Sequence, residues 1–588
     1  ESRHDPTFTL RKFIRPYRGA LNFGLVLVAL DALATLAGPA LVRRGIDSGV
    51  TKASTSALFV ASLAFLAITV ADWGDSIAEV LVTGRTAERL LFALRVRIWA
   101  HLQRLSIDFY EREMAGRIMT RMTTDVEALS SLLQNGLVNA VVNLLTFGGV
   151  AVFLVLMNWQ LALTTLAVVV PLLIATAAFR RLSARAYDTA RERIAVVNAN
   201  LQESLSGVRE SQAFVRERRN KREFRKLSGS YLDARLQAQR LVALYFPFVE
   251  FLSEIAAAVI LGVGSVMIAH RSLTAGELIA FMLYIDMFFA PIQQLSQVFD
   301  SYQQARASMS RINELMQIDT LTPPYPQPVD PGPLVGGLTF ERVRFSYPGV
   351  PPGTEALRGI DLIIAPGERV ALVGETGAGK STVVKLAARF YDPTTGRVLV
   401  DGHDLRTVDL GAYRRSLGYV PQEPFLFSGT IRDNIAYGRP SATNAEVEWA
   451  ARAVGAHDFI AGLPGGYLHV ITERGRSLSA GQRQLIALAR ARLVDPAILL
   501  LDEATSNLDL ATEATVSRAM GIVARGRTTI LIAHRLQTAR TADRIIVMDD
   551  GRVVEDGSHE QLLARRGRYA AMWRSFAIGD EAEEVASA

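Results

Sequence analysis

The sequence contains no cysteine, so disulfide bonds, thiolate catalysis and cysteine-ligated metal sites are excluded. Lysine is also scarce, and the other basic side chains apart from histidine are arginines. The only lysines are Lys12, Lys52, Lys221, Lys226, Lys380 and Lys385. This preference indicates a coding sequence from a high-GC bacterium. No cleavable signal peptide is expected, because the basic stretch 11–18 leads into an apolar segment too long for a signal core.

The length and the hydropathy of the chain predict a combination of membrane-embedded and soluble domains. A chain of 588 residues is too long for one hydrophobic core, so at least two domains are expected. The mean hydropathy of +0.20 is high for a wholly soluble protein. The net charge of +6 fits either nucleic-acid binding or basic loops beside a membrane, and the positions of the arginines favour the second.

Long uncharged stretches predict membrane-spanning helices. No charged side chain occurs from Gly136 to Phe179, which is long enough for two spans of roughly 20 residues with a turn at 158–160. Six spans are predicted, at residues 19–42, 56–80, 136–157, 160–180, 244–269 and 276–299. They define a membrane domain over residues 1–315.

The arginines set the expected orientation. They are concentrated in the N-terminal flank and in the two long segments 83–133 and 180–242, whereas the turns at 158–160 and 270–271 carry few. Arg43 and Arg44 go against this trend. Because basic loops stay in the cytoplasm, both termini and both long segments are expected there, on a multi-pass protein of the bacterial inner membrane. Both long segments have helical periodicity, and we expect their tips, near 106–112 and 209–215, to contact a cytoplasmic partner.

Several carboxylates lie at or near membrane depth, where a charge is costly and usually faces a cavity or a partner. Each is either a contact for a proton or a substrate, or a member of an ion pair at the wet end of the helices. The substrate candidates are Asp31, Asp286, Glu250 and Glu254, and Asp72 belongs to the same group. Asp31 and Asp286 are the most central.

A proline-rich stretch marks the boundary between the two domains. Six prolines fall between residues 322 and 333, which predicts an extended linker over 316–335. The second domain is expected over 336–578, and an acidic tail over 579–588.

The second domain contains a phosphate-binding motif. Gly374–Ser381 reads G-x-x-x-x-G-K-S, and it lies between an apolar strand at 369–373 and a helical stretch at 382–390. The glycines let backbone N–H groups face a phosphate, and the helix N-terminus adds its positive end. Lys380 is expected to reach the β- and γ-phosphates, and the Ser381 hydroxyl to bind Mg²⁺.

Further polar residues end predicted strands, where ligands bind in open α/β sheets. Asp502 closes an apolar run and is expected to hold Mg²⁺, and Glu503 to polarise a water for attack on the γ-phosphate. His534 ends another strand and either bonds the γ-phosphate or is structural. The ring of Tyr347 either stacks on a purine or packs in a hairpin.

Leu478-Ser479-Ala480-Gly481-Gln482, upstream of Asp502, resembles the signature motif of ATP-binding cassette (ABC) proteins. The whole chain resembles a half-transporter of the ABC exporter fold, of the multidrug or lipid type. The resemblance implies an all-α six-helix transmembrane domain with long cytoplasmic helix extensions, followed by an α/β P-loop ATPase domain.

The resemblance also implies a role for each motif. The residues expected to contact ATP are Tyr347, Gly374, Glu375, Thr376, Gly377, Ala378, Gly379, Lys380, Ser381 and Thr382. The residues expected to take part in catalysis are Glu503, His534, Gln422 and Lys380, and those expected to bind Mg²⁺ are Ser381, Gln422 and Asp502. Ser479, Ala480, Gly481 and Gln482 are expected to contact the nucleotide of a second cassette, and Asp509 belongs to the D-loop. The residues expected to couple the cassette to the membrane domain are Asp108, Phe109, Tyr110, Phe214, Glu473 and Arg474.

In such proteins two cassettes close around two ATP molecules, so the resemblance implies a second half-transporter as partner. Ala480 stands where the family commonly has glycine, which slightly favours a heterodimer over a homodimer. The function expected is ATP-driven translocation of a hydrophobic or amphipathic solute, such as a lipid, a fatty-acyl compound or a drug. An importer of a lipid or siderophore-like solute and an ATP-gated regulatory membrane protein are the alternatives. The uncharged stretch 136–179 argues against a soluble, nucleic-acid-directed ATPase.

Overall fold

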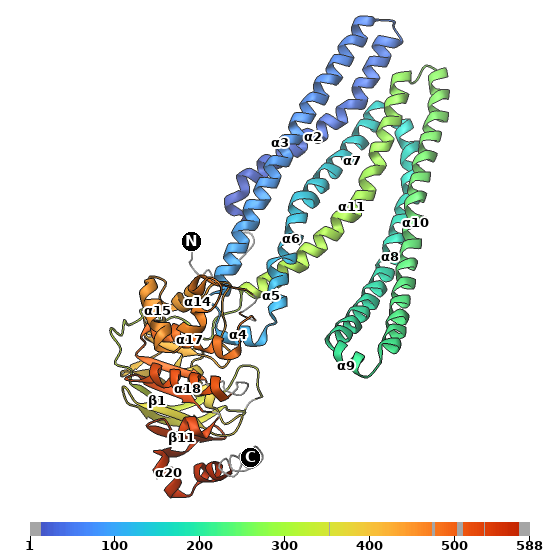
Figure 1. Ribbon diagram of the computed structural model, residues 1–588. Helices are drawn as coiled ribbons and strands as arrows, with labels where there is room; N and C mark the ends of the chain where they lie inside the picture. The colour runs from blue at the N-terminus through green and yellow to red at the C-terminus, as the bar shows by residue number, and fades with distance from the viewer. Residues whose placement is uncertain are drawn as a thin grey trace. The chain divides into compact units, whose positions relative to one another are not determined.

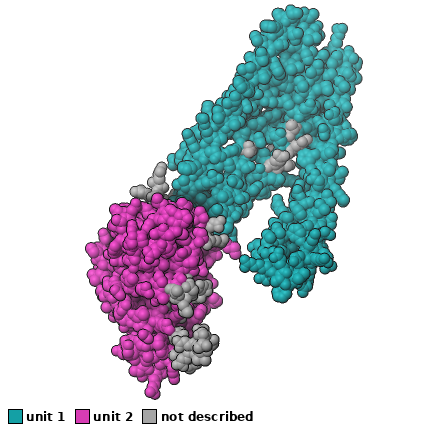
Figure 2. Space-filling view, in the orientation of Figure 1, with its two compact units in different colours: residues 1–103, 115–318 teal, residues 104–114, 319–588 magenta. Residues whose placement is uncertain are grey.

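The computed structural model describes residues 13–351, 353–472, 475, 477–502, 510–533 and 535–575. The chain forms two compact units, shown in different colours in Figure 2. The first unit comprises Glu1–Gln103 and Ala115–Ile318, and the second comprises Arg104–Met114 and Asp319–Ala588. The short segment 104–114 therefore lies between two helices of the first unit in sequence but belongs to the second unit.

The first unit is helical throughout its described length (Figure 1). Its long helices are α2 (Arg18–Arg44), α3 (Thr55–Leu102), α7 (Leu137–Met157), α8 (Trp159–Ser206), α10 (Glu217–Ala269) and α11 (Ala275–Met316). Its shorter elements are η1 (Arg15–Tyr17), η2 (Gly45–Val50), α5 (Ala115–Met122), α6 (Thr124–Ser131), η3 (Leu132–Gly136) and α9 (Val208–Ala213).

Hydropathy and length identify membrane-spanning candidates among these helices. Five stretches of the described chain qualify: Arg15–Val50, Thr55–Leu102, Ala115–Met157, Trp159–Ser206 and Glu217–Ala269. The helix α11 is 42 residues long but is not among the five. The sixth span at 276–299 therefore stays a prediction.

The core of the first unit is built from aromatic and aliphatic side chains of α7, α8, α10 and α11. The ring of Phe179 stacks on that of Tyr245 with centroids 4.1 Å apart, and Phe147 stacks on Phe288 at 4.6 Å. The Tyr284 hydroxyl donates to the carbonyl of Leu36 at 2.7 Å, which ties α11 to α2. The Tyr284 hydroxyl is thus satisfied within an otherwise apolar interior.

A charged cluster joins α6 to α11 outside the predicted spans. The carboxylate of Asp125 is buried, and it accepts hydrogen bonds from the Arg311 guanidinium and from the Ser308 hydroxyl at 2.9 Å. Burial alone raises the pKa of Asp125, but the bonds from Arg311 and Ser308 outweigh burial and hold that pKa below its usual range.

The described part of the second unit contains three sheets. One has four antiparallel strands in the order β2-β1-β4-β5, one has six strands in the order β12-β11-β3-β10-β9-β6, and one has the two strands β7 and β8. The bounds of the strands are β1 (Leu338–Phe345), β2 (Leu357–Ile364), β3 (Arg369–Val373), β4 (Thr395–Val400), β5 (His403–Asp404), β6 (Leu417–Val420), β7 (Gly429–Thr430), β8 (Val470–Ile471), β9 (Ile498–Asp502), β10 (Thr528–Ile532), β11 (Arg544–Asp549) and β12 (Arg552–Gly557).

The six-stranded sheet is parallel from β11 to β6, and only the edge strand β12 is antiparallel. Strands β9 and β10 are buried almost end to end, as is typical of parallel strands with both faces covered. The helical elements of this unit are α4 (Ile107–Arg112), α12 (Lys380–Ala387), α13 (Leu410–Arg415), α14 (Ile431–Ile435), η4 (Ala436–Gly438), α15 (Asn444–Ala453), α16 (His457–Ala461), η5 (Gly466–Leu468), α17 (Ala480–Val494), α18 (Leu510–Ala524), α19 (Leu536–Ala539) and α20 (His559–Arg565).

Asp125→Asn is expected to destabilise the first unit by about 1–2 kcal/mol, because it removes the charge-assisted bonds to Arg311, whose half-exposed side chain is screened by water. Since the folded pKa of Asp125 is lowered, its stabilisation is complete above about pH 4 and is lost as the pH falls through the lowered pKa. Thermal unfolding in detergent at pH 7 measures the effect. Asp188→Asn, at an exposed carboxylate on α8, is the control, and an equal fall in Tm for both variants would contradict the assignment.

Candidate functional site

The carboxyl ends of four neighbouring strands bring several of the predicted residues to one edge of the six-stranded sheet. Asp502 at the end of β9 is paired with Ile532 of β10, and Ile532 is paired with Leu372 near the end of β3. On the other side of β9, Val420 of β6 is paired with Leu501. The loops after β3 and β6 therefore leave the sheet beside Asp502.

The loop after β3 requires glycine at two positions for a physical reason. Gly374 has a φ of 150°, and a Cβ there would lie 2.2 Å from the carbonyl oxygen of Met548. Gly379, with a φ of 99°, begins α12, and a Cβ there would lie 2.8 Å from the carbonyl oxygen of Ala356. At Gly377, by contrast, a Cβ would meet nothing within 4 Å, so the open side of the loop is at this residue. The loop thus leaves room for an anion in front of the N-terminus of α12.

Lys380 lies in the first turn of α12 and is 7% exposed. Its Nζ donates to the carbonyl oxygens of Gly374 and Glu375 at 2.7 and 2.8 Å. Burial lowers the pKa of Lys380, and the nearby Asp502 carboxylate partly offsets this. The amine therefore lies between the loop and the acid at the end of β9, where it can contact a phosphate bound by the loop.

The predicted purine-stacking ring lies next to α12. Tyr347 is half-buried, and its hydroxyl is 3.0 Å from the Thr382 hydroxyl. The ring of Tyr347 meets that of Tyr391 edge to face at 5.4 Å, and the Nζ of Lys385 is 5.3 Å from its centroid. The ring of Tyr347 therefore contacts α12, which begins where the phosphate loop ends.

Among the predicted metal-binding residues, Ser381 is exposed in the first turn of α12 and Asp502 is half-buried at the end of β9. Gln422 is exposed two residues after β6, the strand that flanks β9. Hydroxyl, amide and carboxylate oxygens are ligands that suit Mg²⁺. The predicted roles of Glu503, His534, Asp509, Glu473 and Arg474 fall on residues outside the described part of the chain, as does the tail at 579–588.

The signature motif forms the N-terminus of α17. The Ser479 hydroxyl accepts from the backbone N–H of Gln482, and the Gln482 side chain accepts from the backbone N–H of Ser479, so the two residues form a capping box. Ser479 and Ala480 are exposed, whereas Gly481 is buried. The positive end of a 15-residue helix therefore opens onto the surface of the second unit.

The segment at 106–112 is bonded to the core of the second unit through a residue that the sequence analysis did not single out. One carboxylate oxygen of Glu111 accepts from Lys385 Nζ at 2.8 Å, and the other accepts from the Tyr391 hydroxyl at 2.7 Å. Burial lowers the pKa of Lys385, but the bond to Glu111 outweighs it and raises that pKa above its usual value. Burial and the same carboxylate raise the pKa of Tyr391. Because Lys385 and Tyr391 also contact Tyr347, Glu111 is two contacts from the nucleotide aromatic.

The coupling residues predicted in this segment have mostly local roles. Asp108 is buried, accepts from the Ser106 hydroxyl at 2.5 Å and pairs with Arg112. Phe109 is buried, and Tyr110 is 40% exposed. These residues shape α4, and the contact with α12 is left to Glu111. In the sequence, this role of Glu111 was indicated by its negative charge near the end of the predicted tip at 106–112.

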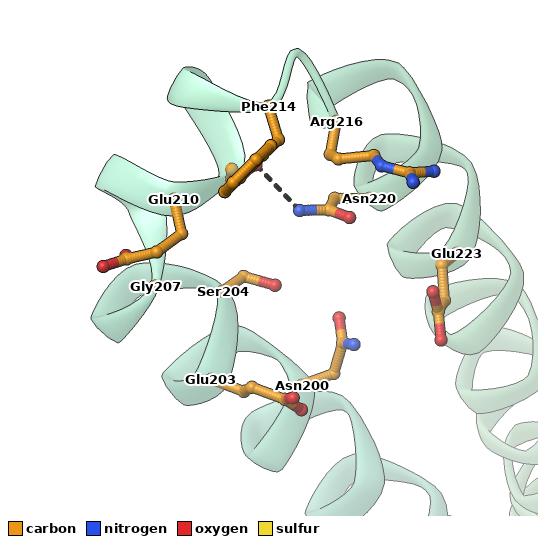
Figure 3. Close-up of a pocket in the computed structure, with 10 residues that line it drawn as sticks. Asn200, Glu203, Ser204, Gly207, Glu210, Phe214, Arg216, Asn220 and Glu223 are labelled. Carbon is orange, nitrogen blue, oxygen red and sulfur yellow. Dashed lines mark hydrogen bonds between the residues drawn. The ribbon is translucent and has the colours of Figure 1, made fainter.

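The other predicted tip is formed by α8, α9 and α10 and encloses a polar cavity of about 480 Å³ (Figure 3). Asn200, Ser204 and Asn220 point into the cavity, and the Asn220 amide donates to the Ser211 hydroxyl at 2.9 Å. Phe214, beyond the end of α9, is 74% exposed. This tip therefore presents an apolar ring among polar side chains.

The four substrate candidates Asp31, Asp286, Glu250 and Glu254 do not form one site. Asp31 on α2 is partly buried beside α3, whereas Glu250 and Glu254 on α10 and Asp286 on α11 are exposed on the first unit. Three phenylalanines of α11 lie in the core of the first unit and do not line an open surface. Phe281, Phe288 and Phe289 are at most 4% exposed.

Two family models match the chain in succession. The first, "ABC transporter transmembrane region", matches residues 21–292, and the second, "ABC transporter", matches residues 357–506. A fatty acid ABC transporter ATP-binding/permease protein of Mycobacterium bovis (strain ATCC BAA-935 / AF2122/97) is 36% identical over 518 residues, which are 88% of this chain and 81% of the relative. The chain belongs to the ABC transporters, and it carries one transmembrane region and one ATP-binding domain of that family.

A more similar relative is the multidrug efflux ATP-binding/permease protein of Mycobacterium bovis (strain BCG / Pasteur 1173P2), which is 46% identical over 566 residues. These residues are 96% of this chain but 47% of the relative, so the chain spans about half the length of that protein. Among solved structures, a bacterial Atm1-family ABC exporter with ATP bound matches with a TM-score of 0.74 and 30% identity, over 95% of this chain and 98% of that one. The exporter-type fold expected from the sequence is therefore confirmed. The preference for arginine over lysine is consistent with the mycobacterial origin of these relatives.

Glu111→Ala is expected to loosen α4, because it removes both the ion pair with Lys385 and the bond from Tyr391. A loss of about 1–2 kcal/mol corresponds to a roughly 5- to 30-fold faster exchange of the amide hydrogens of residues 107–112. Hydrogen exchange with mass spectrometry on the full chain measures this. Asp458→Ala, at an exposed carboxylate of the second unit, is the matched control. Unchanged exchange in α4 would contradict an anchoring role for Glu111.

Proposed function

We propose that this chain is one half of an ATP-hydrolysing transporter that exports a hydrophobic or amphipathic solute across the bacterial inner membrane by alternating access. The observation that carries the proposal is the pair of bonds from Glu111 to Lys385 and Tyr391. Through it, a segment that follows the long helix α3 in sequence contacts the residues around the phosphate loop. Nucleotide binding then affects the position of α4, and with it the helices that continue from α4.

Nucleotide binding is supported by the donor set around the loop. The γ-phosphate of ATP would replace the loop carbonyls as partner of Lys380, and Tyr347 would contact adenine. Ser381, Gln422 and Asp502 offer the hydroxyl, amide and carboxylate oxygens that fit Mg²⁺, which supplies charge neutralisation at the phosphates. Glu503 is proposed as the residue that polarises the attacking water, and His534 as the residue that contacts the γ-phosphate.

A second cassette is proposed to complete the site. The N-terminus of α17 at Ser479 and Ala480 is exposed and carries a positive dipole end, which suits a γ-phosphate held by another cassette. The Ala480 side chain adds only a methyl group at this surface. The exposed Phe214 at the α9 tip is proposed to dock on the cassette of the second half. A heterodimer is slightly favoured, since Ala480 departs from the usual glycine of the family.

The substrate class is proposed from the relatives. One relative is described as a multidrug efflux protein and another as a fatty acid transporter. Both kinds of solute are apolar or amphipathic, and a transmembrane region with exposed apolar helix faces suits them. Export rather than import is proposed because the more similar relative is an efflux protein and the matching structure is an exporter.

Glu503→Gln is expected to lower ATP hydrolysis by about 10²- to 10⁴-fold while ATP still binds, because a neutral amide does not polarise the attacking water. The assay is phosphate release, with nucleotide binding followed separately. Lys380→Ala is the comparison variant, and it is expected to weaken ATP binding itself. ATP-dependent flux of fluorescent lipids and dyes in oriented vesicles tests transport. Hydrolysis without flux of any such solute would favour a regulatory membrane protein instead.

Native mass spectrometry of the purified chain tests the second half. A homodimer is expected at twice the mass of the 64.2 kDa chain. If the transporter is a heterodimer, the chain expressed alone is expected to be a monomer, and a dimer is expected only after co-expression with a homologous half. An active monomer with bound ATP would contradict the proposed two-cassette site.

A further inference from the structure

Four carboxylates lie together between α2 and α3 at membrane depth. Asp72, Asp75 and Glu79 are spaced three and four residues apart, so they share one face of α3. Two close contacts show which face of α3 lies against α2 and the residue that follows it. A Cβ on Gly24 would lie 3.1 Å from the Thr83 side chain, and a Cβ on Gly45 would lie 3.4 Å from the Ala61 side chain. In this antiparallel register Asp31 is level with Asp75.

Asp31 is therefore flanked by acids on the neighbouring helix. It lies within electrostatic range of Asp72 and Asp75, and Glu79 is within range of Asp31 and both of the others. Among the described residues, every charged group that acts on Asp31 or Glu79 at this range is another carboxylate. The cluster therefore has no internal cation to balance its charge.

The carboxylates are also short of hydrogen-bond donors. Glu79 is 8% exposed, and its carboxylate makes no hydrogen bond or ion pair with another described residue. One oxygen each of Asp72 and Asp75 is buried with no hydrogen-bond partner. Leaving such atoms unpaired in a membrane segment is costly, so the arrangement calls for a positively charged occupant from outside the chain.

The surroundings favour an organic cation over a metal ion. No group of three acidic or histidine side chains in the described part of the chain is placed to hold a metal ion, so these carboxylates spread around a volume instead of converging on a point. Both helices are apolar enough to span a membrane, so a cation that reaches these carboxylates from the bilayer must itself carry apolar surface.

We propose that Asp31, Asp72, Asp75 and Glu79 form a binding site for the cationic group of an amphipathic organic solute. Three acids on one helix and one on its neighbour supply the negative charge, and the body of the solute lies among the apolar side chains of the two membrane-spanning helices. This assignment rests on the proposed transport function, since it names the solute class that the helices bind. It selects amphipathic cations over neutral and anionic lipids.

The test is equilibrium binding of tetraphenylphosphonium to the full chain in lipid nanodiscs, without ATP. Tetraphenylborate, which has the same shape and the opposite charge, is the matched probe. Asp31→Asn, Asp75→Asn and Glu79→Gln are each expected to raise the Kd for tetraphenylphosphonium about tenfold or more, because each removes an attractive charge at short range in a poorly screened site. Binding of tetraphenylborate is expected to stay the same or to become tighter.

Asp188→Asn removes a charge from the exposed part of α8 and is expected to leave both Kd values unchanged. Asp75→Glu, which keeps the charge, is expected to retain most of the affinity. A Kd for tetraphenylphosphonium that stays within twofold in all three neutralised variants overturns the site. Equal weakening of both probes also overturns it, since that result indicates an apolar or structural effect.

The two proposals fail separately. Because binding is measured without nucleotide, charge-selective binding by a chain that does not hydrolyse ATP would retain the site and reject the transport function. ATP-driven flux of a neutral lipid together with charge-insensitive binding would retain transport and reject the site.

Discussion

The bonds from Glu111 to Lys385 and Tyr391 are the interaction on which the proposed coupling depends. Glu111 lies in α4, a six-residue helix between α3 and α5 in sequence, yet α4 belongs to the same compact unit as the phosphate loop. Its carboxylate uses both oxygens, one on a cation and one on a hydroxyl, and both partners also contact Tyr347. A charge-assisted pair of this kind is directional, so it fixes the orientation of α4 as well as its position. Purely apolar packing of so short a helix would leave that orientation less defined.

The two regions assigned to ligands manage charge in opposite ways. At the phosphate loop, the chain supplies the positive side: Lys380, the N-terminus of α12 and open backbone at Gly377. Between α2 and α3 it supplies only negative groups, and buried oxygens of Asp72 and Asp75 have no partner. In both places we propose that a ligand supplies the opposite charge. The membrane site has the stronger electrostatic requirement, since lipid offers no water to compensate an unpaired carboxylate.

Much of the second unit was predictable because its motifs are local. The strand before the phosphate loop and the strand ending at Asp502 follow from short apolar runs, and the glycines at 374 and 379 follow from the backbone geometry of the loop. Five stretches of the described chain are long and apolar enough to span a membrane, as hydropathy predicts, whereas α11 is not among them. The roles of Asp108, Glu111 and the phenylalanines were harder to predict, because each depends on which residues lie opposite in space. Asp108 satisfies its own helix, and Phe281, Phe288 and Phe289 fill the helix core.

The sequence alone determined the class of protein, the order of its two domains and the presence of an ATP-binding domain, because the spacing of motifs along the chain specifies each of these. Only the tertiary structure decided which side chains meet. Glu111 and Lys385 are 274 residues apart in sequence, and Asp31 reaches the acidic face of α3 only through the register of two antiparallel helices. Pairings of this kind depend on packing between elements, and a pattern within one segment carries no information about its neighbour.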